Sequence, residues 1–257
     1  MNADARTPEI EIAGLTKRYG DGKPVVQSVD LQVRKSEFVS ILGASGCGKS
    51  TILKLISGLA VPTSGTIRVE GMTPQDAREI ISFIFQDATL LPWRTVTDNV
   101  GLGLELEGEP SGAREEKVKA LLDLVGLRNV ARAYPRELSG GMKMRVSIAR
   151  ALATSPRLLL LDEPFAALDE MTRDRLNEEI LRMRAEQNWT AVFVTHSVAE
   201  AVFLADRIVV LAPNPGRIHA EFPVDLPAPR ASAIRTSPEF DAIVARVSHS
   251  LRETLRQ

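Results

Sequence analysis

The sequence predicts an α/β fold that combines a mostly parallel sheet, an N-terminal antiparallel β subdomain and a helical insertion. Short apolar runs such as Leu158–Leu161 and Ala191–Thr195 alternate with helical patterns, which is typical of a parallel sheet covered on both faces. Residues 9–70 are rich in β-forming residues, whereas residues about 87–155 show helical periodicity. With 44% apolar and 25% charged residues, the 257-residue chain has a globular composition, which excludes disordered and fibrous classes.

The sequence of residues 9–70 predicts an antiparallel sheet and, within the same stretch, a strand that is followed by a loop and a helix. Partial alternation runs from Ile10 to Val33, and Thr66–Glu70 alternates cleanly, so an antiparallel sheet is expected here. Between these segments, Glu37–Leu42 is a mostly apolar strand that ends in a glycine-rich turn. The turn leads into Thr51–Ile56, whose apolar residues recur with helical spacing.

The rest of the chain predicts the insertion and the second half of the sheet. Val118, Leu121, Leu122 and Val125 lie on one face of an expected helix, and a second helix is expected from near Gly141. Later strands are expected at Leu158–Leu161, Ala191–Thr195 and Arg207–Leu211, separated by helices at Met171–Glu186 and Val198–Leu204.

The C-terminal end predicts a turn, a connector and a last helix. Pro213–Gly216 is the turn and Pro223–Pro229 the extended connector. Ser237, Pro238 and Glu239 supply an N-cap, an N1 proline and an acidic first turn to an amphipathic helix. We therefore expect one domain over residues 1–220, with the insertion at about 87–155, and a C-terminal extension over residues 221–257.

Charge and composition narrow the class of protein. The 32 Lys and Arg residues balance 33 Asp and Glu residues, which disfavours a protein that coats nucleic acid. No apolar stretch approaches the ~20 residues that span a bilayer. The segment Met1–Arg6 lacks the apolar core of a signal peptide, and the lone Cys47 has no internal disulfide partner. The chain is therefore expected to work in a reducing cytosol.

A phosphate-binding loop is the strongest motif. The pattern G-x-x-x-x-G-K-[ST], placed between a strand and a helix, is matched by Gly43, Ala44, Ser45, Gly46, Cys47, Gly48, Lys49 and Ser50, with Thr51 following. Its backbone amides and the helix N-terminus suit a polyphosphate, with Lys49 on the β and γ phosphates and the Ser50 hydroxyl on Mg²⁺. The bland alternative is a glycine turn that caps a helix. Cys47 is either a small side chain that fits or a nucleophile activated by the positive field.

Two carboxylates and a histidine follow the expected strands. Asp162 and Glu163 end the Leu158–Leu161 run, at the sheet edge where open α/β sheets bind ligands. Asp162 is the candidate Mg²⁺ ligand and Glu163 the candidate general base that activates water. His196 follows the next strand and is a candidate γ-phosphate contact; the alternatives are a polar strand end for the carboxylates and a capping or core role for His196.

Further motifs accompany the phosphate loop over about residues 9–220. Leu138–Met142, which contains Ser139, Gly140 and Gly141, lies between the phosphate loop and the Asp162–Glu163 strand, where it resembles the signature motif of ATP-binding cassette ATPases, and the other motifs occur in the order of that family. Tyr19 resembles the aromatic residue that stacks on adenine, Gln86 the glutamine of the Q-loop, Ala167–Asp169 the D-loop and His196 the switch histidine. Two departures, Met142 for the usual glutamine and Ala166 where serine is common, concern details of the dimer contact.

The resemblance implies an ATPase that works in pairs. In this family two copies face each other head to tail, so Ser139, Gly140, Gly141 and Asp169 would complete the ATP site on the other copy's Gly43–Thr51 loop. Gln86 would join Ser50 and Asp162 in arranging Mg²⁺ and water. The partner is a second copy or a paired ATPase subunit.

The resemblance also implies transport. The segment Gln86–Val100, the Asn214–Ile218 turn and the Ser237–Phe240 helix start are similar to those of importers of nitrate, taurine and aliphatic sulfonates. Leu90, Leu91 and Trp93 then either form a groove for membrane permease subunits or fill the core of the insertion. An extracytoplasmic solute-binding protein would act indirectly, no nucleic acid is expected, and the chain would lie peripherally on the cytoplasmic face of the membrane. The alternatives are a soluble cassette ATPase of DNA repair, translation or cofactor assembly, and a non-hydrolytic regulatory module.

Overall fold

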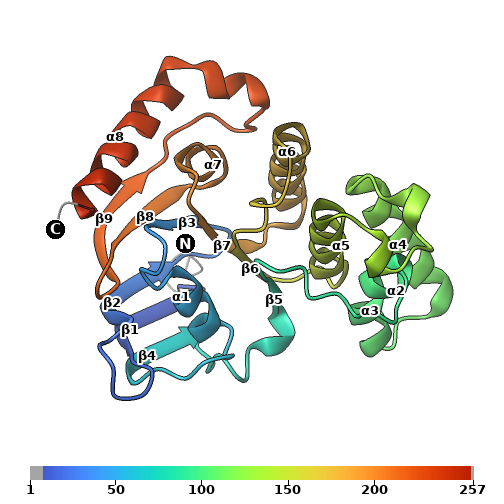
Figure 1. The fold of residues 1–257 in the computed structure, drawn as a ribbon, viewed down its shortest axis with the longest axis horizontal. Helices are drawn as coiled ribbons and strands as arrows, with labels where there is room; N and C mark the ends of the chain where they lie inside the picture. The colour runs from blue at the N-terminus through green and yellow to red at the C-terminus, as the bar shows by residue number, and fades with distance from the viewer. Residues whose placement is uncertain (1–7, 256–257) are drawn as a thin grey trace, which may run out of the picture.

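The computed structural model describes residues 8–255 and contains two sheets with helices packed around them (Figure 1). The Met1–Arg6 segment considered above lies outside the described residues. The central sheet has the strand order β5-β6-β7-β3-β8-β9, and a second sheet has the order β2-β1-β4. The predicted combination of a mostly parallel sheet, an antiparallel N-terminal sheet and a helical insertion is confirmed.

The central sheet places strands that are far apart in sequence side by side. Its strands are β3 (Phe38–Gly43), β5 (Ile81–Ile84), β6 (Leu158–Asp162), β7 (Thr190–Thr195), β8 (Arg207–Ala212) and β9 (Arg217–Pro223). The first five pair in parallel, so their carboxyl ends share one edge, and only β9 runs antiparallel, against β8. This shared edge brings together the residues that follow β3, β6 and β7.

The second sheet and the helices surround this arrangement. The antiparallel strands are β1 (Ile10–Lys17), β2 (Val26–Val33) and β4 (Ser64–Val69). The helices are α1 (Lys49–Ile56), α2 (Val96–Val100), α3 (Leu102–Leu106), α4 (Ser111–Leu124), α5 (Gly140–Ala153), α6 (Glu170–Gln187), α7 (Val198–Leu204) and α8 (Pro238–Thr254). Short 3₁₀ turns occur at Arg78–Ile80, Arg128–Val130, Pro135–Glu137 and Ser232–Thr236. Within residues 8–255, no helix has both the length and the apolar character needed to cross a lipid bilayer.

Two strands were not among the predicted elements. β5 is a four-residue strand in which only Ile84 is fully buried, so its sequence carries a weak strand pattern. β9 has no buried residue and mixes charged and apolar side chains next to a predicted turn. The other strands and helices for which the sequence predicts both ends form within two residues of those ends, and α2 and α3 lie within the predicted helical insertion.

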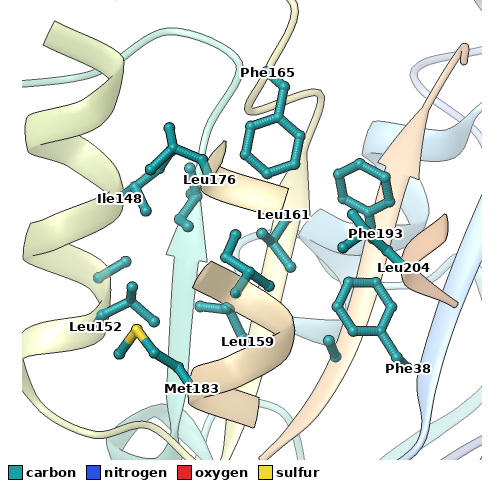
Figure 2. Close-up of a cluster of buried hydrophobic side chains, with 14 of the residues drawn as sticks. Phe38, Ile148, Leu152, Leu159, Leu161, Phe165, Leu176, Met183, Phe193 and Leu204 are labelled. Atoms are coloured by element: carbon teal, nitrogen blue, oxygen red, sulfur yellow. The ribbon is translucent and has the colours of Figure 1, made fainter. Parts of the chain in front are cut away.

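Buried residues gather in two clusters, one on each face of the central sheet. The four leucines of β6 show the arrangement, because Leu159 and Leu161 belong to one cluster and Leu158 and Leu160 to the other. Figure 2 shows the first cluster, where side chains of α5 and α6 meet those of β6. Near them, the rings of Phe165 and Phe193 lie 5.7 Å apart between centroids. Burial on both faces explains why these strands are continuously apolar.

The C-terminal extension packs against the same core. Phe240, Ile243 and Val247 of α8 are buried in the cluster of Figure 2, and α8 contacts α7 and β8. Ser237 caps the helix by accepting a hydrogen bond from the Phe240 amide, as the sequence predicted. Because residues 220 and 221 lie inside β9, we propose that the extension begins after Pro223.

The buried Glu9 side chain is expected to make the free energy of unfolding depend on pH. Burial, first, and the nearby Glu70 carboxylate raise the pKa of Glu9 from 4.5 to about 7. Between these pH values the folded chain binds more protons than the unfolded chain, so stability falls as pH rises through this interval. Glu9→Gln, which cannot ionise, is expected to show a higher Tm than the wild type at pH 8 and a smaller Tm loss between pH 5 and 8.

Differential scanning fluorimetry across this pH range measures the effect. Glu11→Gln is the matched control, because Glu11 is exposed on β1, the strand that begins directly after Glu9. A Glu9→Gln variant with the wild-type pH profile would contradict the assignment.

Candidate functional site

A cavity of about 510 Å³ lies at the carboxyl edge of the central sheet. It is lined by Tyr19, Val25, Ser45, Gly46, Gly48, Lys49, Ser50, Thr51, Gln86, Glu163 and His196. The lining therefore joins the loop between β3 and α1 to residues that follow β5, β6 and β7. Ten of these residues are predicted site residues; Val25 is the additional one.

The loop between β3 and α1 adopts a shape that requires glycine. Gly48 has φ +98°, and a Cβ there would lie 2.6 Å from Val26 Cγ2. A Cβ on Gly43 would lie 2.5 Å from Cys47 Sγ. Any larger residue at either position would displace a neighbour, so the glycine spacing of the motif follows from the packing of the loop.

Lys49 lies folded inside this loop. It is 6% exposed, and its Nζ donates hydrogen bonds to the carbonyl oxygens of Gly43 at 2.8 Å and Ala44 at 3.0 Å. Three donors on an ammonium group leave room for a further acceptor. The loop therefore presents a positive charge and the N-terminus of α1 to the same cavity.

Asp162 and Ser50 form an oxygen pair beside the loop. The Ser50 hydroxyl donates to Asp162 Oδ1 at 2.8 Å. Burial raises the pKa of Asp162 above its ordinary value, and the hydrogen bond from Ser50 opposes this shift. A buried carboxylate next to a hydroxyl is a pair of hard oxygen ligands of the kind that Mg²⁺ prefers.

Glu163 and His196 are in direct contact. The backbone of Glu163 is left-handed, with φ 47°, and its amide donates to the carbonyl oxygen of Val194 at 2.9 Å. Its Oε2 lies 3.1 Å from Nδ1 of His196. The turn at Glu163 thus sends its side chain into the cavity, while the Asp162 side chain meets Ser50.

Tyr19 and Gln86 lie at the cavity's outer parts. The ring of Tyr19 is half exposed, and Lys17 Nζ lies 4.7 Å from its centroid. Gln86 is exposed and follows β5 by two residues. Both side chains have room to contact a bound molecule.

The remaining predicted residues do not line this cavity. Ser139 caps α5 by accepting from the Met142 amide at 3.3 Å, and Asp169 caps α6 by accepting from the Thr172 amide at 2.9 Å. The two loops pack together, because a Cβ on Gly141 would lie 3.3 Å from the carbonyl oxygen of Ala167. Gly140 begins α5 in the same segment. Among the residues that the structure describes, the N-terminus of α5 therefore lies outside the cavity of its own chain, where it can meet solvent or a ligand bound in another pocket.

Cys47 lies beneath the loop rather than in the cavity. Its side chain is 1% exposed and belongs to the buried cluster that includes Val26. Burial raises the pKa of the thiol, and the nearby Lys49 opposes this shift only in part. This favours the small fitted side chain over the nucleophile.

The buried thiol predicts slow labelling. Native protein treated with a maleimide at pH 7 is expected to remain largely unmodified, because Cys47 is both buried and protonated. Full labelling is expected in denaturant, and as Cys47 is the one cysteine of the chain, mass spectrometry reads it directly. Rapid stoichiometric labelling of the native protein would restore the nucleophile interpretation.

The sequence does not reveal two positioning residues: Arg150 carries no motif, and Gly216 belongs to the Asn214–Ile218 turn, which shows no link to the phosphate loop in the sequence. Arg150 of α5 donates to the carbonyl oxygens of Ala88 and Thr89, just after Gln86. Gly216 packs so closely under the phosphate loop that a Cβ there would overlap the Cys47 carbonyl oxygen. A three-dimensional arrangement is needed to find either residue.

The segment after Gln86 supports both interpretations in part, because one of its side chains fills the core and another is exposed. Leu90 packs against the core, whereas Trp93 is 71% exposed. Buried Asn99 fixes the backbone on both sides of Trp93 by donating to the carbonyl oxygens of Leu91, Arg94 and Thr95. The exposed Trp93 therefore stands on a rigid loop.

Known proteins resemble this chain over most of its length. The family model described as "ABC transporter" matches residues 26–166. The chain is 43% identical over 233 residues to the nitrate import ATP-binding protein NrtD of Synechocystis sp., which covers 88% of each chain. It is 44% identical over 241 residues to the aliphatic sulfonates import ATP-binding protein SsuB of Bacillus licheniformis, which covers 93% of this chain and 92% of the relative.

A solved structure shows the same arrangement of elements. The dimeric structure of a post-hydrolysis state of the ATP-binding cassette MJ0796, bound to ADP and Pi, has a TM-score of 0.79 and 31% sequence identity. The match covers 84% of this chain and 99% of that one.

Proposed function

This chain belongs to the ABC transporter family, and we propose that it is the ATP-hydrolysing subunit of an importer for a small oxyanion-bearing solute, namely an aliphatic sulfonate, taurine or nitrate. The observation that carries the proposal is the single cavity that unites Lys49 with the Glu163–His196 pair. The similarity to the import ATP-binding proteins NrtD and SsuB supports an importer over a cassette ATPase of DNA repair, translation or cofactor assembly.

The polar and aromatic groups of the cavity have distinct roles in hydrolysis. The loop amides and Lys49 bind the phosphates, and Tyr19 at the rim stacks on the base. The Glu163 carboxylate accepts a proton from the attacking water as general base. His196 holds the Glu163 side chain and donates to the transferring phosphoryl group, whose negative charge it stabilises.

Mg²⁺ is the expected cofactor, and the donor set fits it. Ser50 and Asp162 offer adjacent oxygen atoms, and Gln86 adds an amide oxygen from the cavity wall. When bound, the ion would neutralise charge on the β and γ phosphates. Ser50, Asp162 and Gln86 would orient it.

A second subunit would complete the site. Ser139, Gly140, Gly141 and Asp169 lie outside the cavity of their own chain, although Ser139 and the first turn of α5 suit an anion. We propose that they cap ATP in the cavity of a partner copy or paired ATPase subunit. The dimeric state of the MJ0796 cassette supports this arrangement.

The exposed Trp93 loop is the proposed contact with membrane permease subunits. Trp93 is 71% exposed on a loop whose backbone is held by Asn99, and it lies in the Gln86–Val100 segment that is similar to that of the importers, which supports this contact. The subunit would then lie peripherally on the cytoplasmic face of the membrane, with an extracytoplasmic solute-binding protein delivering the solute.

Growth and uptake test the proposed function. A strain that lacks this subunit should fail to grow on the transported solute as its only sulfur or nitrogen source, and wild-type protein should restore growth. The Glu163→Gln variant should not restore it, although it reaches the same abundance. Normal uptake of sulfonates, taurine and nitrate in the deletion strain, or a subunit that never sediments with membranes containing its permeases, would contradict an importer.

A further inference from the structure

We propose that Arg173 and Glu200 form a positioning pair that fixes the loop of His196 relative to the D-loop, Ala167–Asp169, and thereby sets the rate of hydrolysis. The inference deepens the proposed ATPase function and rests on it. Neither residue lines the nucleotide cavity, so the pair acts through the loops that it joins.

Glu200 holds the loop that carries His196. It lies in the first turn of α7 and is 7% exposed. Its Oε2 accepts a hydrogen bond from the Thr195 hydroxyl at 2.6 Å, and the same hydroxyl oxygen accepts from the Ser197 amide at 3.0 Å. Both residues that flank His196 are therefore fixed through one buried carboxylate.

Arg173 holds the D-loop. It lies in the first turn of α6, and its Nη2 donates to the carbonyl oxygen of Leu168 at 2.9 Å. Its Nε lies 3.4 Å from Glu200 Oε1. The guanidinium group thus spans the gap between the residue before Asp169 and the carboxylate that holds the His196 loop.

The position of this bridge gives it a catalytic consequence. Glu163, His196 and Asp169 follow β6, β7 and the turn before α6, so their relative placement depends on how the two helix starts are joined. The pair links these helix starts next to the reacting groups. Small displacements of catalytic groups reduce rates strongly even where binding persists.

A second connection between α6 and α7 runs through Arg235 and supplies a matched control. Arg235 of the C-terminal segment lies with Nη2 3.1 Å from Asp174 Oδ1 of α6, and its guanidinium carbon lies 3.9 Å from the ring centroid of Phe203 of α7. Asp174 is adjacent to Arg173 in sequence but contacts neither loop. Asp174→Asn therefore weakens the α6–α7 connection without touching the proposed bridge.

The test is a double-mutant cycle on ATP hydrolysis. Arg173→Gln and Glu200→Gln are each expected to reduce kcat by about tenfold with KM for ATP changed less than about twofold, because only the placement of groups in the transition state changes. The double variant should be no slower than either single variant, since both substitutions break one connection. Arg173→Lys, which keeps the charge, should recover part of the rate.

Thermal unfolding separates positioning from folding, with all rates measured below the lowest Tm. Asp174→Asn should lower Tm while kcat stays at the wild-type value. Unchanged kcat in the Gln variants, additive losses in the double variant, or an equal loss in Asp174→Asn would each overturn the proposal. A wild-type protein without ATPase activity would instead overturn the proposed function.

Discussion

Replacing Glu163 with Gln is expected to reduce ATP turnover by at least ~10²-fold while ATP binding remains, because the amide cannot accept the proton of the attacking water. The variant keeps the size of the side chain and a hydrogen-bonding atom toward His196, whose Nδ1 lies 3.1 Å from the present carboxylate. Phosphate release measures turnover, and titration calorimetry measures binding.

The same variant tests the shared site. With saturating Mg-ATP it should accumulate as a dimer in light scattering, since the nucleotide that joins the two copies is not consumed. Glu186→Gln, an exposed change on α6, should hydrolyse ATP at the wild-type rate. Wild-type turnover in Glu163→Gln would remove Glu163 from the role of general base, and a strictly monomeric variant, even with its permeases present, would refute the arrangement of two facing copies.

Replacing Lys49 with Ala is expected to weaken ATP binding by about 10- to 100-fold, the range that follows from losing a charge-assisted hydrogen bond. The ammonium group now donates to the carbonyl oxygens of Gly43 and Ala44, so it is held in place before the phosphates arrive. Titration calorimetry with a non-hydrolysable ATP analogue and Mg²⁺ measures the change.

Lys54→Ala is the matched control for this substitution. Lys54 lies on the same helix but is exposed and lies outside the cavity lining. Its affinity for the analogue should stay within about twofold of the wild type, as is usual for surface substitutions. An unchanged affinity in Lys49→Ala would contradict the phosphate-loop assignment.

The sequence predicts much of the fold because its signals are local. The continuous leucines of β6 report burial on both faces, and Ser139, Asp169 and Ser197 precede helices that they cap. β5 and β9 lack such signals: one is too short, and the other has no buried residue. Their pairing depends on neighbours that are distant in the chain.

Part of the candidate site is likewise visible in the sequence, and part of it becomes visible only in the structure. The loop Gly43–Ser50 and the strand-end residues Asp162, Glu163 and His196 are visible as motifs, since each follows a predicted strand. The left-handed backbone of Glu163 and its contact with His196, 33 residues later, are not visible in a linear pattern. Arg173 and Glu200 resemble ordinary helical charges until α6 and α7 are placed side by side.

The position of β3 in the sheet has a consequence for biosynthesis. β3 pairs with β7 on one side and β8 on the other, so the strand that leads into the phosphate loop is complete only after Ala212 has been made. Gly216, which packs under that loop, follows four residues later. A ribosome-bound nascent chain that ends before β8 would leave the β8 side of β3 as an unpaired strand edge, which is a hazard for misassembly. Such a chain should depend on chaperones and acquire ligand affinity only near the end of translation.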